Sequence, residues 1–325
     1  MPSLVQHVIF QSFVASGCDR LVWRLRPKQL RILCYHGICA DSLAGEPWVP
    51  SYFVTQSAFE RQLQYLQRHA NLLHLSQAVA CLRDGSLPPR CVSITFDDGY
   101  ANNLELAYPL LKKYQAPATV FLASAYMESG EIFPFLKLKL IKLSGRDGCE
   151  PSLPPPLDYK ANPLDLVVQR AKPHWERLAP HLSDYQRRTL RPLTVEEVQL
   201  ADPRLIEFGA HSHTHCILTN ESRLRRREEI LTSIDKVEQF TGRRVLLFSY
   251  PNGQREDFDE LDKEVLRSRG IEAAVSGMAG ANDGRADALE LRRFPVGMYH
   301  GDAGFRAEVA GFRAALLAVR GRLES

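Results

Sequence analysis

Short apolar runs alternate with amphipathic segments along most of this chain. Residues 30–35, 91–96 and 118–123 are apolar runs of strand length, and residues 57–69 and 104–114, which lie between them, carry apolar side chains at helical intervals. Repeated strand–helix–strand order predicts parallel strands, and functional groups of such folds gather where the strands end. We therefore expect an α/β protein with its site at the carboxyl ends of the strands.

Length and charge limit the remaining possibilities. A chain of 325 residues with 45% apolar content has room for two domains or for one α/β barrel of about 200 to 250 residues with additions, and we expect the latter. Lys and Arg total 41 against 38 Asp and Glu, a net charge of +3. Such a balance does not indicate a polyanion-binding surface, so we expect no nucleic acid partner.

The N-terminal segment, residues 1–29, has apolar residues at helical spacing followed by several arginines. It has no basic region before its apolar stretch and is too short and polar to span a membrane. It is predicted to form an amphipathic helix, which either covers the domain's own core or makes peripheral contact with a membrane.

The seven cysteines are odd in number and scattered, and none forms a Cys-x-x-Cys pair. This distribution is typical of reduced thiols rather than of a disulfide framework. We expect a cytoplasmic protein, with membrane association through the N-terminal helix and export both left open.

Prolines interrupt the alternating pattern in the middle of the chain. Residues 130–192 contain five of them between positions 151 and 163, together with charged helical pieces, and are interpreted as an insertion or lid. Order resumes with a helix over 194–200, opened by a Thr194/Glu197 capping box, and a strand over 206–210. The barrel is thus predicted over 30–300, followed by a C-terminal helical tail over 301–325.

Two adjacent carboxylates, Asp97 and Asp98, directly follow the apolar run 91–96. At the end of a strand, neighbouring side chains approach one site from different angles, so one carboxylate can bind a cation while the other takes a proton. An ordinary turn is the alternative, because Asp-Gly is common in hairpins.

Two histidines four residues apart, His211 and His215, follow the predicted strand 206–210. This spacing lets both imidazoles converge on one ion, although histidines near a helix cap have the same pattern. Two His and one Asp would leave coordination positions open for water and substrate. With a second carboxylate to accept the proton of that water, the set predicts hydrolysis of an amide or ester.

At this point the chain resembles a known family. Thr95–Tyr100 and His211–His215 look like the first two motifs of the polysaccharide deacetylases with the NodB-homology fold, also classed as carbohydrate esterase family 4, and Phe248–Gly253 looks like the third. The resemblance covers roughly residues 30–296. It implies a distorted (β/α) barrel with Asp97 as catalytic base.

The same resemblance implies metal ligation by Asp98, His211 and His215, with Zn²⁺ preferred and Co²⁺ or Ni²⁺ as alternatives. The metal and a backbone N–H stabilise the oxyanion in this family, and the backbone of Asn252 is the matching donor. The motif residues assigned to substrate binding are Tyr100, Tyr250, Pro251 and Asn252.

The sequence also departs from the family's pattern. Ser249 stands where many members have Arg, Asn252 replaces an aromatic residue, and the later Asp-Trp and Leu-x-His motifs have no clear counterpart. We predict that Arg293 points into the barrel to pair with Asp97, or else lies on an exposed strand edge.

Several histidines could supply the missing chemistry. We predict that His36, after the first strand, is catalytic and near the metal, although a hydrogen-bonded structural histidine is the alternative. His300 is a further possible acid, and His213 is expected to support the ligands or to be exposed.

The predicted function is metal-dependent removal of N-acetyl groups from an N-acetylated glycan or glycan precursor. The alternatives are a deformylase or deacylase of a lipid-linked sugar or small amide, and a catalytically inactive sugar-binding homologue.

Overall fold

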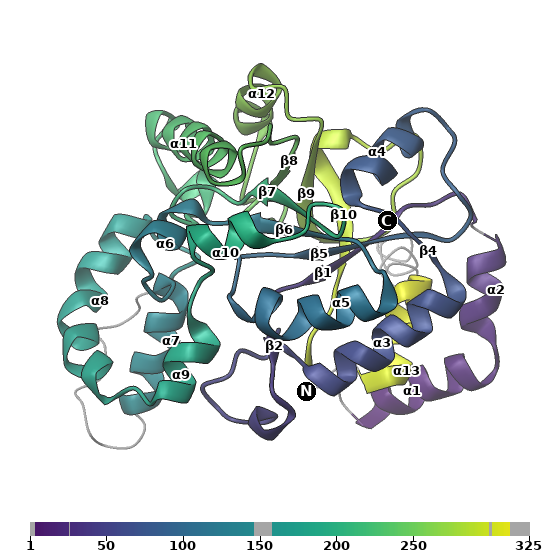
Figure 1. The fold of residues 1–325 in the computed structure, drawn as a ribbon, viewed down its shortest axis with the longest axis horizontal. Coiled ribbons are helices and arrows are strands. Elements are labelled where there is room, and N and C mark those ends of the chain that lie inside the picture. The colour runs from purple at the N-terminus through teal and green to yellow at the C-terminus, as the bar shows by residue number, and fades with distance from the viewer. Residues whose placement is uncertain (1–3, 26, 146–157, 299–300, 313–325) are drawn as a thin grey trace, which may run out of the picture.

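A closed parallel barrel forms the centre of the molecule in the computed structural model, which describes residues 4–25, 27–145, 158–298 and 301–312. Within these residues the barrel strands follow the order β1-β10-β9-β8-β7-β6-β5, and β5 pairs back with β1 (Figure 1). The strands are β1 (Arg31–Tyr35), β5 (Cys91–Phe96), β6 (Ala118–Leu122), β7 (Ile206–Ala210), β8 (Leu247–Ser249), β9 (Ala273–Ala279) and β10 (Leu291–Pro295). The predicted α/β barrel is confirmed.

Three short strands add to this barrel. β4 (Asn71–Leu72) extends the sheet along β5, while β2 (Ile38–Cys39) and β3 (Val54–Thr55) form a separate parallel pair. All residues of β1, β5 and β6 are buried. This burial is expected where one face of a parallel strand lines the barrel interior and the other lies under helices.

The outer helices return the chain from one strand to the next. They are α3 (Gln56–His69), α4 (Leu75–Arg83), α5 (Tyr108–Tyr114), α6 (Ser124–Ser129), α10 (Val195–Leu200), α11 (Arg223–Thr241) and α12 (Glu260–Ser268). The predicted capping box is present: the Thr194 side chain accepts from the Glu197 N–H, and the Glu197 carboxylate accepts from the Thr194 N–H.

The prediction of one continuous helix is wrong. The helix expected over 104–114 begins instead as a π-helical turn, Asn103–Ala107, and becomes α-helical at Tyr108. Pro109 lies at this junction and has no N–H to donate, which disfavours an uninterrupted α-helix.

The N-terminal segment forms two helices, α1 (Leu4–Ala15) and α2 (Cys18–Leu25), rather than one. Gly17 separates them with a φ of +75°, a conformation that glycine adopts without steric cost. Both helices pack against α13 (Gly301–Ala310), and Arg306 of α13 forms an ion pair of 2.7 Å with the buried Asp19. Residues 313–325 of the predicted C-terminal tail lie outside the described residues.

The surface of α1 and α2 remains partly apolar. Val8, Ile9, Leu21 and Leu25 are between 44% and 71% exposed. In the described part of the chain, no helix has the length and hydropathy needed to cross a membrane.

The predicted insertion lies between β6 and β7 and is largely helical. It contains α7 (Pro134–Ser144), α8 (Leu164–Leu178) and α9 (Asp184–Leu190), which gather at one side of the barrel, opposite α1, α2 and α13 (Figure 1). Helices α7 and α8 share a small apolar cluster formed by Leu138, Ile141, Val167 and Ala171. The insertion is therefore a packed layer that can support residues at the barrel rim.

Candidate metal and catalytic site

The four residues expected to carry the chemistry meet at one end of the barrel. β5 ends at Phe96, immediately before Asp97 and Asp98, and β7 ends at Ala210, immediately before His211. The two strands flank β6 in parallel, so their carboxyl ends lie at the same rim. The strand register thus brings together motifs that are 113 residues apart in the sequence.

Asp98, His211 and His215 form a buried triad. The Oδ1 atom of Asp98 lies 3.0 Å from Nε2 of His215 and 3.4 Å from Nε2 of His211. Ligand atoms about 2.0 to 2.1 Å from one tetrahedral ion are roughly 3.3 Å apart, so this spacing suits a divalent cation. The same Oδ1 is buried and accepts no hydrogen bond within the described residues, as expected of an oxygen that binds a cation.

The outer nitrogen of each imidazole is held by an oxygen of the protein. Nδ1 of His211 lies 2.7 Å from the carbonyl oxygen of Ser249, and Nδ1 of His215 lies 2.8 Å from the hydroxyl of Tyr159. A proton on Nδ1 leaves the Nε2 lone pair directed at Asp98, which is the tautomer that a metal ligand requires.

Ionisation favours the same arrangement. Burial alone would raise the pKa of Asp98, but its interactions with His211 and His215 outweigh this effect and hold its pKa well below the usual range. Burial alone would lower the pKa of His211, but the nearby Asp97 and Asp98 raise it overall. The carboxylates that attract a proton to this place would also attract a cation, which replaces that proton on binding.

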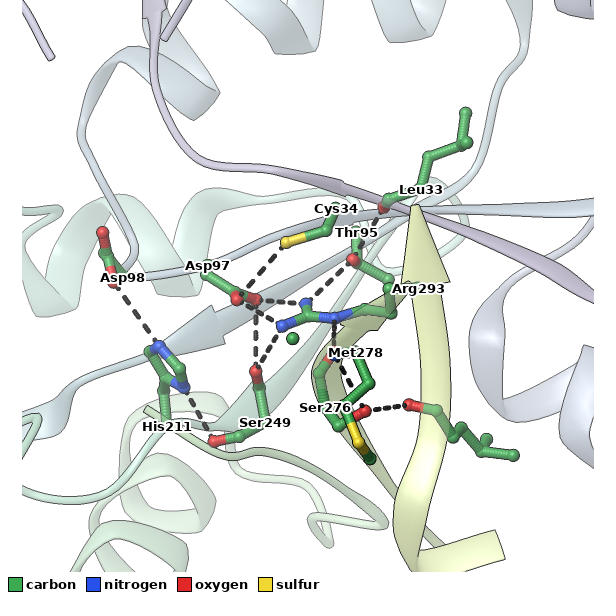
Figure 2. Close-up of polar contacts among 12 residues, drawn as sticks. Leu33, Cys34, Thr95, Asp97, Asp98, His211, Ser249, Ser276, Met278 and Arg293 are labelled. Atoms are coloured by element: carbon green, nitrogen blue, oxygen red, sulfur yellow. Dashed lines mark hydrogen bonds and ion pairs between the residues drawn. The ribbon is translucent and has the colours of Figure 1, made fainter. Parts of the chain in front are cut away.

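The guanidinium of Arg293 is hydrogen-bonded to the carboxylate of Asp97 beside the triad, as Figure 2 shows. The guanidinium donates from Nη1 to Oδ1 at 2.7 Å and from Nη2 to Oδ2 at 2.6 Å, and Ser249 adds a hydroxyl hydrogen bond of 3.3 Å. Burial opposes ionisation of Asp97, but the Arg293 charge outweighs it and lowers the pKa of Asp97 to about 2. Asp97 is therefore a carboxylate at neutral pH.

The position of Arg293 resolves one departure from the family pattern. Its side chain is 3% exposed, and its Nε donates to the carbonyl oxygen of Ser276 at 2.8 Å, so the alternative of an exposed strand edge is wrong. Ser249, where many family members have Arg, is too short to form such a pair. In this chain β10 supplies the guanidinium instead, and Ser249 accepts a hydrogen bond from Nη2 at 3.1 Å.

His36 lies at the same rim. One of its ring nitrogens falls in a group with Cys34 and Asp97 whose potential ligand atoms are all within 4.8 Å of one another. Its Nδ1 is buried and makes no hydrogen bond in the described part of the molecule, while its ring packs against Tyr52 at 4.7 Å. No hydrogen bond to a described residue therefore holds this nitrogen, and the catalytic role of His36 stays a prediction.

The predicted substrate contacts need correction at two tyrosines. Tyr250 is 1% exposed, its ring stacks on Phe258 at 3.9 Å and its hydroxyl donates to the Leu289 carbonyl. Tyr100 is fully buried, with its hydroxyl 3.3 Å from that of Tyr52. Neither side chain presents a surface to substrate, because Tyr250 is enclosed in the core and Tyr100 is enclosed with its hydroxyl beside Asp98.

The remaining two predicted contacts differ from each other. Pro251 is buried, whereas Asn252 is half-buried. The Asn252 side chain donates to Asp257 at 2.5 Å, and its backbone N–H makes no hydrogen bond to another described residue. The side-chain amide of Asn252 is therefore occupied, and its backbone N–H is the free donor, as predicted.

Backbone strain is concentrated at the site. Six described residues other than glycine have positive φ, and four of them belong to these motifs: Asp98 (73°), Ser212 (56°), His215 (57°) and Asn252 (58°). Each such residue costs on the order of 1 to 3 kcal/mol, and such strain clusters at functional sites. Two of the four are the predicted metal ligands Asp98 and His215.

Other residues stand outside the predicted set. His213 is hydrogen-bonded to Ser124 at 2.8 Å and is no part of the triad, and His300 lies outside the described residues. Sequence reasoning missed Cys34, whose thiol donates to Asp97 at 3.6 Å. Strand alternation toward the barrel interior was a usable signal for Cys34, whereas no spacing signal pointed to Tyr159.

A parallel barrel with a two-histidine, one-aspartate triad beside a clamped carboxylate at its carboxyl rim is typical of hydrolases that bind a divalent metal ion. Comparison with known families places the chain more narrowly. The family model described as polysaccharide deacetylase matches residues 84–274. The chain belongs to the polysaccharide deacetylase family.

Individual relatives agree with this assignment over different lengths. The poly-beta-1,6-N-acetyl-D-glucosamine N-deacetylase of Staphylococcus aureus is 40% identical over 80 residues, which are 24% of this chain and 28% of that protein. Only a little more than a quarter of the length of that relative is therefore matched.

Solved structures share the fold over more of the chain. The Streptococcus pyogenes deacetylase PplD, solved with acetate, superposes with a TM-score of 0.63 and 18% identity over 87% of this chain and 99% of that one. IcaB from Ammonifex degensii gives a TM-score of 0.59 and 18% identity over 87% and 97% of the two chains. The same barrel thus occurs at low sequence identity.

Proposed function

We propose that this protein is a metal-dependent deacetylase that removes N-acetyl groups from an N-acetylated glycan, with poly-β-1,6-N-acetylglucosamine as the first candidate substrate. One observation carries the proposal: the carboxylate of Asp97, clamped by Arg293, directly adjoins a triad whose geometry suits a divalent cation. The candidate glycan comes from the name of the Staphylococcus aureus relative.

Each residue has a part in this reaction. A divalent ion at the triad would polarise the amide carbonyl and make a bound water more acidic. Asp97 accepts the proton of the attacking water, because Arg293 keeps it ionised and in one orientation. The free backbone N–H of Asn252 donates to the oxyanion. His36, whose Nδ1 makes no hydrogen bond in the described part of the molecule, is the proposed acid: its protonated imidazolium gives a proton to the leaving amine and becomes neutral imidazole.

Zn²⁺ is the proposed ion. Two neutral imidazoles and one carboxylate match the ligand set of catalytic zinc sites, which keep an open position for water. Co²⁺ and Ni²⁺ accept the same ligands, so availability decides among them.

The test is acetate release from β-1,6-linked N-acetylglucosamine oligomers by protein stripped of metal and then reloaded with Zn²⁺ or Co²⁺. Asp97→Asn should lower kcat by about 10²- to 10⁴-fold, the usual contribution of a positioned base. Asp202→Asn is the matched control, because Asp202 pairs with Arg204 on the surface at 2.8 Å. Metal binding without acetate release would reject this substrate, and absence of metal binding would favour an inactive sugar-binding homologue.

A lipid-linked substrate is the second candidate, favoured by the exposed apolar side chains of α1 and α2. In this version the helices rest on a membrane surface and the same site removes a formyl or acyl group from a lipid-linked sugar. The six described cysteines are all free thiols, which supports a location facing the cytoplasm. Leu21→Ser with Leu25→Ser should abolish co-sedimentation with anionic vesicles, and equal sedimentation of variant and parent would reject membrane contact.

A further inference from the structure

The two histidines of the triad differ in the group that orients them, because the partner of His215 lies outside the barrel. The Nδ1 atom of His211 is held by the backbone of Ser249 on β8. The Nδ1 atom of His215 is held by the hydroxyl of Tyr159 at 2.8 Å, and Tyr159 belongs to the insertion between β6 and β7. The two imidazoles therefore depend on different parts of the fold.

The hydroxyl of Tyr159 also donates to the backbone carbonyl of His215. A phenol has a single proton, so a hydroxyl that donates to the carbonyl must accept from the imidazole. His215 is thereby fixed with its proton on Nδ1 and its Nε2 lone pair facing Asp98. The same contact holds a backbone with a φ of +57°, a conformation that persists only where its surroundings enforce it.

Helix α7 and the loop that follows His215 hold the segment with Tyr159 in place. Phe135 of α7 packs its ring against His215 at 4.9 Å and against Tyr159 at 5.6 Å. On the other side, the Asn220 side chain donates to the Lys160 carbonyl at 3.0 Å, and Glu221 accepts from the Leu164 N–H at 2.8 Å. The segment with Tyr159 is thus tied to the loop that follows the ligand.

We propose that Tyr159 is a positioning residue for the metal ligand His215, so that the insertion completes the metal centre. The inference rests on the proposed metal site and names a residue that no motif contains. Groups that orient ligand imidazoles typically contribute about 10- to 100-fold to metal affinity or activity.

The experiment compares Tyr159→Phe with the parent protein. Phenylalanine keeps the ring that packs on Phe135 and removes only the hydroxyl. The Zn²⁺ dissociation constant, measured by competition with a chromophoric chelator, should rise about 10- to 100-fold. The visible absorption of the Co²⁺ form should change as well, because the His215 imidazole is free to rotate. Tyr185→Phe is the control, since Tyr185 lies in the same insertion but is 72% exposed.

The outcomes separate this inference from the proposed function. Unchanged Zn²⁺ affinity and an unchanged Co²⁺ spectrum in Tyr159→Phe would overturn the positioning role, whatever the parent protein hydrolyses. Weaker binding together with the altered spectrum supports it, even if no acetylated glycan proves to be a substrate. A parent protein that binds neither ion would overturn both.

Discussion

Arg293 and Asp97, 196 residues apart in the chain, are joined by two parallel hydrogen bonds inside the barrel. Their side chains are 3% and 4% exposed. The other guanidinium hydrogen bonds are to Ser276, Thr95 and Ser249, so the costly burial of this charge is offset by bidentate pairing and further acceptors. The pair links β10 to the end of β5 and fixes the proposed base next to the metal ligand Asp98.

Replacing Arg293 with glutamine should impair both stability and catalysis. Removing one partner of a buried ion pair costs about 3 to 5 kcal/mol, because the other charge is left uncompensated. The pKa of Asp97 should rise, since burial then acts without the opposing guanidinium. The acid limb of the pH profile of kcat/KM should therefore move to higher pH.

Arg226→Gln is the matched control for this prediction. Arg226 is a buried arginine that joins α11 to α12, and its ion-pair partners are Asp262 and Asp259 rather than residues of the site. Urea titration should show a loss of stability in both variants, with the pH profile displaced only in Arg293→Gln. Identical pH profiles for Arg293→Gln and the parent would show that the guanidinium does not control the base.

The stability of the metal-free protein should depend on acid through Asp97. Its pKa is about 2 in the folded state against a usual value of 3.8. The unfolded state therefore binds more protons between these values, so the stabilisation is complete above pH 3.8 and is lost as the pH falls through 2. A shift of this size corresponds to about 2 kcal/mol.

Urea unfolding in the presence of a chelator, from pH 5 down to the lowest pH at which the proteins remain folded, measures this effect. The parent protein should be more stable than Asp97→Asn at pH 5, and the difference should shrink as the pH falls. A difference that stays constant with pH would contradict the depressed pKa.

The barrel and its central residues follow from local patterns in the sequence. The apolar runs around Cys91–Phe96 and Ile206–Ala210 mark strands, and a parallel arrangement necessarily places Asp97, Asp98 and His211 at one rim. The inward orientation of the Arg293 side chain was predictable, because Arg293 alternates with apolar neighbours in β10. Its pairing with Asp97 was one of two predicted alternatives, and the choice between them depended on how the last strand closes the barrel.

Other parts of the site depend on tertiary packing that spacing does not encode. Tyr250 belongs to a motif that resembles a substrate-binding loop, yet it stacks on Phe258 in the core. Tyr159 lies in a proline-interrupted insertion without periodicity and still contacts His215. Sequence patterns report which face of a strand or helix is buried, but not which loop residue reaches across to another loop.

Removing a triad ligand should abolish metal-dependent stabilisation. In the parent protein, an ion at 100 times its dissociation constant should stabilise the fold by about 2.7 kcal/mol. Asp98→Ala and His211→Ala should bind less than one equivalent of Zn²⁺ and show no rise in Tm. His213→Ala is the control, because His213 lies between the ligands in sequence but is hydrogen-bonded to Ser124. Loss of Zn²⁺ binding in His213→Ala alone would show that the triad does not hold the metal ion and that His213 does.

Asn252 should act through its backbone rather than its side chain. Glycine adopts the φ of +58° found at this position without a steric cost, whereas alanine is strained there by roughly 1 to 2 kcal/mol. Asn252→Gly and Asn252→Ala should therefore differ in stability but both keep kcat within a few-fold of the parent value. An amide-to-ester replacement of the backbone at position 252 should instead lower kcat by about 10²- to 10³-fold, because it removes the donor to the oxyanion. A large loss of kcat in Asn252→Gly would assign the role to the side chain.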